Sequence, residues 1–108
     1  MNNLLIIEKY EEFVNYIYPV IQNVDRKHGY IKQKFIDLIF QQVDIFYKAI
    51  KSNQKSRLYE ADGNLATIRF YLRFLANEKR KLLSKKQQQV CEIKLAEVGS
   101  ILNSWIKK

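Results

Sequence analysis

The sequence has few residues that interrupt helices or cross-link a chain. Its 108 residues include three glycines, one proline, one cysteine and one histidine. So few turn-forming residues imply few turns and long elements, and the abundance of Leu, Ile, Lys, Gln and Glu favours helices. A single cysteine excludes an internal disulfide and is typical of a reducing compartment.

Long apolar runs are also missing. No run reaches the roughly 20 residues that cross a bilayer, and the apolar segment Leu4–Ile7 is too short for the core of a signal peptide. We therefore expect a cytoplasmic protein without a membrane span. Because 47% of the residues are hydrophobic, we expect residues 1–108 to fold as a single domain rather than a disordered basic tail.

Acidic residues are scarce in the central third of the chain. Residues 48–86 carry 11 lysines and arginines against only Glu60, Asp62 and Glu78. The other residues carry eight basic and eight acidic groups, so the whole formal net charge of +8 comes from this stretch. A concentrated cationic surface on a folded chain indicates a polyanionic partner, with nucleic acid as the first candidate.

The first half of the sequence predicts two helices. Apolar residues recur at three- and four-residue spacing from about Leu4 to Val24 and from about Tyr30 to Ser52. The intervening Arg26-Lys27-His28-Gly29 predicts a turn, with Gly29 suited to a left-handed cap. The apolar sector of the second helix covers roughly 220°, about twice what a surface helix of a monomer needs. This surplus predicts packing beyond its own bundle.

The second half predicts two more helices. A heptad seam from Leu58 to Leu75 stays in phase through residues 62–64, so we expect that segment to remain helical. Ser84 and Gln87 match a capping box, which predicts a fourth helix from Ser84 to about Ile106. Four helices with short links favour an all-α fold, an antiparallel up-down four-helix bundle.

Three aromatic residues lie in line on the third helix, opposite its core seam. They are Tyr59, Phe70 and Phe74. Isolated exposed aromatics are common, but we expect these three to have no partner within one bundle. Together with the wide apolar sector of the second helix, they predict a homo-oligomer with these residues in its interface.

The sequence offers little for catalysis. His28 is the only histidine, and the sequence around it offers no side chain to orient it and no nucleophile for it to activate. Cys91 falls on an apolar helix face, where a cysteine acts as a small hydrophobic residue. Metal-ligand spacing and a phosphate-cradling glycine loop are both missing. We therefore expect a non-enzymatic protein without metal or cofactor, and assign no role to His28.

The cations predict a surface that holds phosphates without reading sequence. Arg69 and Arg73 lie four residues apart, and their guanidinium groups suit phosphate or a partner's carboxylate; an ion pair with Asp62 is the alternative. In an antiparallel bundle, the cations before and after these two arginines fall at opposite ends. We assign thirteen residues to this basic surface: Arg26, Lys27, Lys48, Lys51, Lys55, Arg57, Arg69, Arg73, Lys79, Arg80, Lys81, Lys85 and Lys86.

Several short segments, in this order and spacing, are similar to one family. From about Glu8 to Ile106 the chain resembles Avd, the accessory variability determinant of diversity-generating retroelements. The segments are Glu8-Lys9-Tyr10-Glu11, Tyr16-Ile17-Tyr18-Pro19, Arg26-Lys27-His28-Gly29, Lys51-Ser52-Asn53-Gln54, Leu58-Tyr59-Glu60-Ala61-Asp62, Leu72-Arg73-Phe74-Leu75-Ala76 and Ala96-Glu97-Val98-Gly99-Ser100-Ile101-Leu102-Asn103-Ser104-Trp105-Ile106.

This resemblance implies a function. Avd proteins are small basic four-helix bundles that form barrel-shaped homopentamers. They bind the element's reverse transcriptase and nucleic acid, and support mutagenic retrohoming, in which the polymerase carries the chemistry. By matching positions, the resemblance places these residues on the basic surface: Arg26, Lys27, Lys51, Arg57, Arg69 and Arg73. The chain departs from the Avd pattern at residues 77–83, which are richer in lysine and arginine.

Two alternatives stay open at this point. Proteins encoded in intervening sequences of ribosomal RNA look like the same pentameric bundle. A purely structural oligomer, whose charges only keep it soluble, would bind no nucleic acid at physiological salt. A membrane-surface module is disfavoured, because it needs an exposed apolar helix face and the apolar faces are required for packing.

Overall fold

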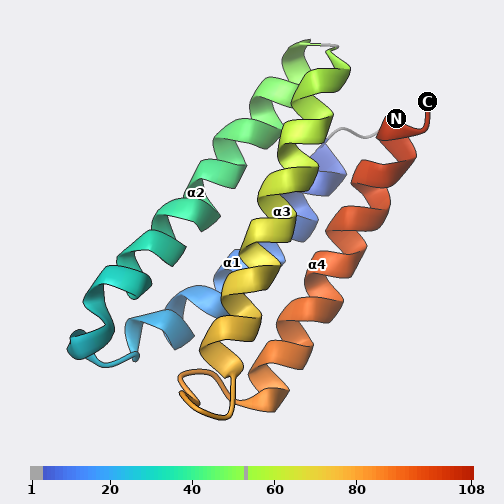
Figure 1. Ribbon diagram of the computed structural model, residues 1–108. Helices are drawn as coiled ribbons and strands as arrows, with labels where there is room; N and C mark the ends of the chain where they lie inside the picture. The colour runs from blue at the N-terminus through green and yellow to red at the C-terminus, as the bar shows by residue number, and fades with distance from the viewer. Residues whose placement is uncertain (1–3, 53) are drawn as a thin grey trace.

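Helices make up nearly all of this computed structural model, which describes residues 4–52 and 54–108. The four α-helices are α1 (Leu4–Gln22), α2 (Gly29–Ser52), α3 (Lys55–Ala76) and α4 (Lys85–Ile106), and a short 3-10 helix, η1 (Arg26–His28), precedes α2. They form an elongated body of 42 × 23 × 20 Å (Figure 1). Within the described ranges there is no strand, and the predicted all-α fold is confirmed.

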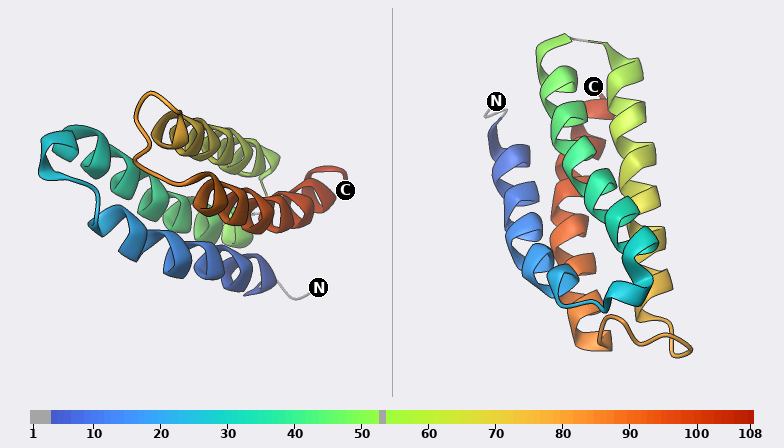
Figure 2. Two further views of the ribbon diagram at one scale, coloured as in Figure 1. Left: turned by 90° about the horizontal axis from the view of Figure 1, so that it is seen from below. Right: turned by 90° about the vertical axis from the view of Figure 1, so that its left-hand side faces the viewer.

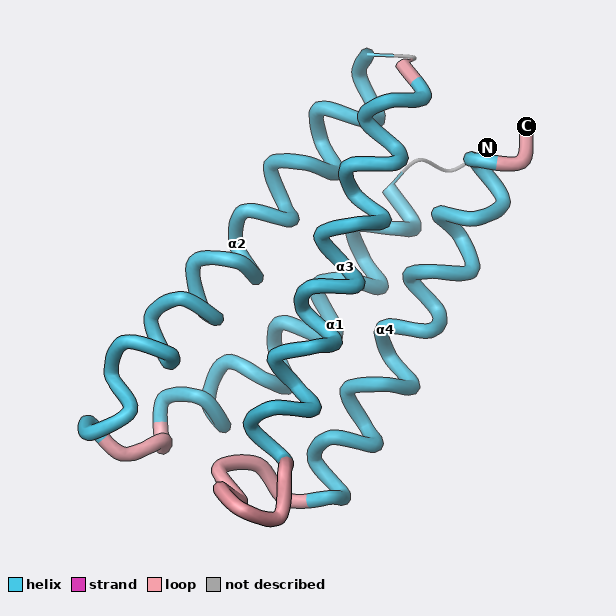
Figure 3. Tube along the Cα trace, in the orientation of Figure 1, coloured by secondary structure: helices cyan, strands magenta, loops and turns pink. Residues whose placement is uncertain are grey.

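Each helix packs against the next one along the chain, and α4 returns to pack against α1 (Figures 1 and 2). The predicted antiparallel up-down bundle is therefore confirmed. Loops are confined to the two ends of the body (Figure 3). The α2–α3 link, the start of α1 and the end of α4 lie at one end, and the α1–α2 and α3–α4 links lie at the other (Figure 1).

The connection between α1 and α2 differs in detail from the prediction. Helix α1 ends at Gln22 rather than Val24, and Lys32 Nζ donates to the carbonyl oxygens of both residues, at 3.0 and 3.2 Å. The expected left-handed cap at Gly29 is wrong. Its φ of −55° and ψ of −38° are those of a right-handed helix, because η1 has already reversed the chain and Gly29 starts α2.

The continuity of α3 through residues 62–64 is confirmed, and a buried polar contact explains it. Gln42 of α2 is fully buried, and its Nε2 donates to the carbonyl oxygen of Ala61 over 3.0 Å. Asn64 Nδ2 donates in turn to Gln42 Oε1 over 2.6 Å. A buried amide needs such partners, so this contact offsets the poor helix propensity of the segment.

The capping box at the start of α4 is confirmed. Ser84 Oγ accepts from the amide of Gln87, and Gln87 Oε1 accepts from the amide of Ser84, both at 3.0 Å. The link before it folds back on α3, since the amides of Leu82 and Leu83 both donate to the carbonyl oxygen of Leu75. Leu83 is thereby buried.

The core is a single apolar cluster that all four helices share. Its largest fully buried side chains include Tyr10, Phe13, Phe35 and Phe46. The Tyr10 hydroxyl donates to the carbonyl oxygen of Ile39 over 2.6 Å, which satisfies its one polar group. Among the described residues, none of the helices combines the length and apolar character needed to cross a bilayer.

Candidate nucleic-acid interface

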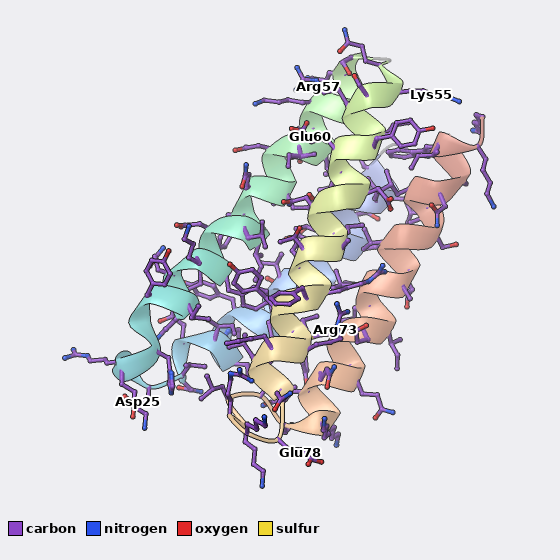
Figure 4. All side chains as sticks on the ribbon, viewed as in Figure 1. Asp25, Lys55, Arg57, Glu60, Arg73 and Glu78 are labelled. Carbon is purple, nitrogen blue, oxygen red and sulfur yellow. The ribbon has the colours of Figure 1, made fainter. Side chains whose placement is uncertain are left out.

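Two groups of predicted cations lie at opposite ends of the bundle. We call Lys48, Lys51, Lys55 and Arg57 the turn-end cluster, because they surround the α2–α3 link (Figure 4). The link-end cluster, at the α3–α4 link, comprises Lys79, Arg80, Lys81, Lys85 and Lys86. Arg26 and Lys27 belong to η1, at the same end as this second cluster. The predicted separation of the cations is therefore observed.

Most of these cations are available to a ligand. Eleven of the thirteen are exposed, and only Arg57 and Arg69 are half-buried. In residues 4–52 and 54–108, Arg57 is the one member with an ion pair, at 3.7 Å from Glu60 one turn away. Exposed pairs of this kind contribute about 0.3–0.5 kcal/mol. The acids therefore neutralise very little of this surface.

Arg69 and Arg73 have different environments despite their similar sequence positions. Arg69 extends across to α4, where its Nη2 donates to the carbonyl oxygen of Leu95 over 3.2 Å. Arg73 is exposed on the side of α3 near α4 (Figure 4), and has no hydrogen bond or ion pair to any described residue. The alternative of an ion pair between either arginine and Asp62 is not observed in the described part of the chain.

Gly99 makes room for the bridge from Arg69 to α4. A Cβ atom at this position would lie 3.2 Å from Arg69 Nη2, which is tighter than ordinary van der Waals contact. The hydrogen bond to Leu95 thus depends on a glycine one turn along the same helix. The contact between Arg69 and Gly99 could not be predicted from the sequence, because it depends on how α3 and α4 align with each other.

The link-end cluster has an ordered backbone. Lys81 adopts a positive φ of 53°, and its amide donates to the carbonyl oxygen of Asn77 over 2.8 Å. The Arg80 guanidinium carbon lies 3.7 Å from the ring centroid of Phe74, a cation–π contact. A pocket of ≈ 550 Å³ opens between the end of α3 and the start of α4, with Lys81 and Lys85 in its wall.

We call Tyr59, Phe70 and Phe74 the α3 ridge. The expectation that all three lack partners within one bundle is wrong. Phe70 lies 6.3 Å from the Phe74 ring and 6.0 Å from the Tyr71 ring, and Arg80 covers the half-buried Phe74. Tyr59 and Phe70 nevertheless remain 58% and 55% exposed. The exposed part of the ridge is therefore its two members nearest the α2–α3 link.

The predicted surface consists of lysine and arginine side chains, which bind anions. Groups of three or more potential metal ligands do not occur in the described chain. Cys91 is buried as predicted, and desolvation, followed by the nearby charge of Glu92, raises the pKa of its thiol to about 12. A thiol with so high a pKa is a poor nucleophile at neutral pH.

A family model described as bAvd-like matches residues 4–108. The chain belongs to the bAvd-like family. It is therefore an Avd-type accessory protein, and the resemblance found in the sequence is confirmed. A comparison with curated proteins gives no match.

The Avd-type chain also has a surface feature that the sequence analysis missed. A groove lies between α1 and α2, lined mainly by apolar side chains that include Val14, Phe40 and Val43. One sequence signal could have found it. Ile7, Val14 and Tyr18 recur on α1 at helical spacing, on a stripe distinct from the core positions Ile6, Tyr10, Phe13 and Ile17.

Proposed function

We propose that this chain is a non-enzymatic accessory protein of a diversity-generating retroelement. Its basic surface binds the reverse transcriptase and nucleic acid, as template RNA or cDNA, and thereby supports mutagenic retrohoming. It acts as a homo-oligomer; the number five follows from the resemblance to Avd alone. The α3 ridge lies in the subunit interface.

One observation carries this proposal. Twelve of the thirteen predicted cations have no ion pair in the described residues, although the chain has eleven acids in total. Unpaired lysines and arginines release counterions when they meet phosphates, which makes binding favourable and strongly dependent on salt. The arrangement has no pattern for reading base edges, so it suits binding that is not sequence-specific.

Binding to a labelled single-stranded RNA, measured by fluorescence anisotropy over a salt series, tests the proposal. Affinity should fall steeply with salt, with a slope of about −0.7 per phosphate neutralised on a logarithmic plot. Absence of binding at physiological salt would instead favour the purely structural oligomer. Co-purification with the element's reverse transcriptase is the second measurement, and its loss in link-end and turn-end variants is expected.

A matched pair of variants separates the surface from net charge. Lys79→Ala with Lys81→Ala removes two link-end cations and should weaken RNA binding. Lys34→Ala with Lys94→Ala removes the same charge elsewhere, where each ammonium lies over a tyrosine ring at 5.6 and 6.0 Å. Equal losses in both variants would mean that binding follows overall charge and not the proposed surface.

A further inference from the structure

The α3 ridge is shaped to enter a groove. Its exposed aromatics Tyr59 and Phe70 are eleven residues apart, or roughly 16 Å along the helix. Between them lie Gly63 and Ala66, both exposed, and a Cβ atom at Gly63 would meet nothing within 4 Å. A helix with large side chains at two points and small ones between them allows another helix pair to approach closely at its centre.

A groove of matching character lies on another side of the same bundle. The α1–α2 groove is a hollow of ≈ 380 Å³, with apolar walls that include Ile7, Val14, Phe40 and Tyr47. Its α1 edge continues to Tyr18, whose ring meets that of Phe40 edge-on at 5.9 Å. The α1 residues that line the hollow run from Ile7 to Asn15, eight residues apart or roughly 12 Å along the helix.

Exposed charges of opposite sign lie beside part of the ridge and part of the groove. Glu11 lines the groove, Glu8 lies one turn before it, and Asp44 is within one turn of both Phe40 and Tyr47. All three acids are exposed, and none of them has an ion pair to a described residue. The ridge is bordered by the unpaired cations Arg73 and Arg80. Lys48 and Lys51 lie beside Tyr47 at one end of the groove, and Asp62 lies within one turn of Tyr59. The complementary charges are therefore Arg73 and Arg80 beside the ridge and the three acids along the rest of the groove.

We propose that the α3 ridge of one copy of this chain docks in the α1–α2 groove of a second copy. This inference rests on the proposed homo-oligomer and specifies its contact. Helix α3 packs on α2 and α4 but not on α1, so the ridge and the groove face different directions around the bundle. The contact is heterologous, because it joins two different surfaces of the chain. A linear series of copies would have a free ridge at one end and a free groove at the other, and joining these two ends closes the series into a ring.

Complementation between two assembly-deficient variants tests this docking. Phe70→Glu inactivates the ridge and keeps the groove, whereas Phe40→Glu inactivates the groove and keeps the ridge. Both residues are exposed in the single chain, so each variant should retain the helical circular dichroism of the wild type. Light scattering should give close to 12.9 kDa for each variant alone, and about twice that mass for their equimolar mixture.

The control is Ile93→Glu, which alters an equally exposed apolar residue of α4 outside both surfaces and should assemble as the wild type does. The proposal is overturned if Phe40→Glu assembles normally, if the mixture stays monomeric, or if Ile93→Glu abolishes assembly. It is also overturned if Phe70→Glu assembles normally but loses RNA, because the ridge would then stack bases. Failure of the proposed nucleic-acid function looks different: the wild type would assemble and bind no RNA.

Discussion

The side-chain amide of Asn64 donates to Gln42 Oε1 over 2.6 Å, across the contact between α2 and α3. Gln42 is the one polar residue that is fully buried among the described residues. Because only one register of the two helices satisfies both ends of this amide, the pair fixes how α2 and α3 align.

Removing the Asn64 side chain should therefore destabilise the bundle. Asn64→Ala leaves a buried acceptor on Gln42 without its donor, which costs about 1–3 kcal/mol. Urea denaturation at a fixed protein concentration measures the free energy of unfolding. Asn103→Ala is the control, because Asn103 is exposed on α4 and its replacement by alanine raises the helix propensity by the same amount. Equal stability of the two variants would contradict the role given to Asn64.

The capping box supports a second prediction. Ser84→Ala removes the acceptor for the amide of Gln87 and should lower the free energy of unfolding by about 1 kcal/mol. Ser84→Asp should retain most of the stability, because its carboxylate can accept the same hydrogen bond. Ser56→Ala, in the exposed first turn of α3, is the control. Thermal denaturation followed by circular dichroism compares the three variants with the wild type.

Gly99 and Arg69 should behave as a coupled pair. An alanine within a helix is about 1 kcal/mol more favourable than glycine, but a Cβ atom at Gly99 would press on Arg69 Nη2. Gly99→Ala should therefore stabilise the wild type less than it stabilises an Arg69→Ala background. A double-mutant cycle from urea denaturation measures the difference. The same gain in both backgrounds would show that the contact carries no strain.

Burial of Cys91 predicts a stability that falls at high pH. Because burial raises the pKa of the thiol from 9.0 to about 12, the folded chain holds its proton over a range where the unfolded chain loses it. The unfolded state binds fewer protons there, so stability is constant below about pH 9 and declines as the pH rises towards 12. Burial raises the pKa of the Tyr10 hydroxyl as well, which adds to the decline above pH 10.

The variant Cys91→Ala separates the contribution of the Cys91 thiol to this pH dependence from that of the Tyr10 hydroxyl. The variant should be less stable at neutral pH, because it leaves a small cavity, but its stability should decline less between pH 8.5 and 10. The free energy of unfolding, measured by urea denaturation at several pH values, provides the test. An unchanged decline would assign it to Tyr10 and the other titrating groups.

The two arginines of α3 should contribute unequally to RNA binding. Arg73 has its full set of donors available, whereas Arg69 already donates to the carbonyl oxygen of Leu95. We expect Arg73→Ala to weaken RNA binding and Arg69→Ala mainly to lower stability. Anisotropy and urea denaturation on the same two variants check this split. The reverse ranking would mean that the bridge to α4 opens when RNA binds.

The sequence predicted the elements of this fold better than the contacts between them. Periodicity and the Ser84 capping box located α4 almost to the residue, because both signals are local. The error at Gly29 arose because a 3-10 turn and a left-handed cap can follow the same residues. The covering of Phe74 by Arg80 depends on a link that folds back on α3, and no local pattern encodes that return.

The basic surface shows the same limit. Exposed lysines were located correctly, because a charged side chain on the outer face of a helix stays in solvent. The different environments of Arg69 and Arg73 were not predicted, since they depend on Gly99 of another helix. The α1–α2 groove was not predicted, because it depends on how α1 and α2 pack against each other.

The alternation of helix direction brings the start of α1 and the end of α4 to the end of the bundle that holds the α2–α3 link (Figure 1). A fluorescent protein or affinity tag fused after α4 will therefore lie at the same end of the bundle as Lys51 and Lys55, and at the opposite end from Lys81 and Lys85. Such a fusion can block a binding partner that approaches Lys51 and Lys55 while leaving Lys81 and Lys85 accessible. A tagged protein that keeps one binding partner and loses the other would reveal which end each partner uses.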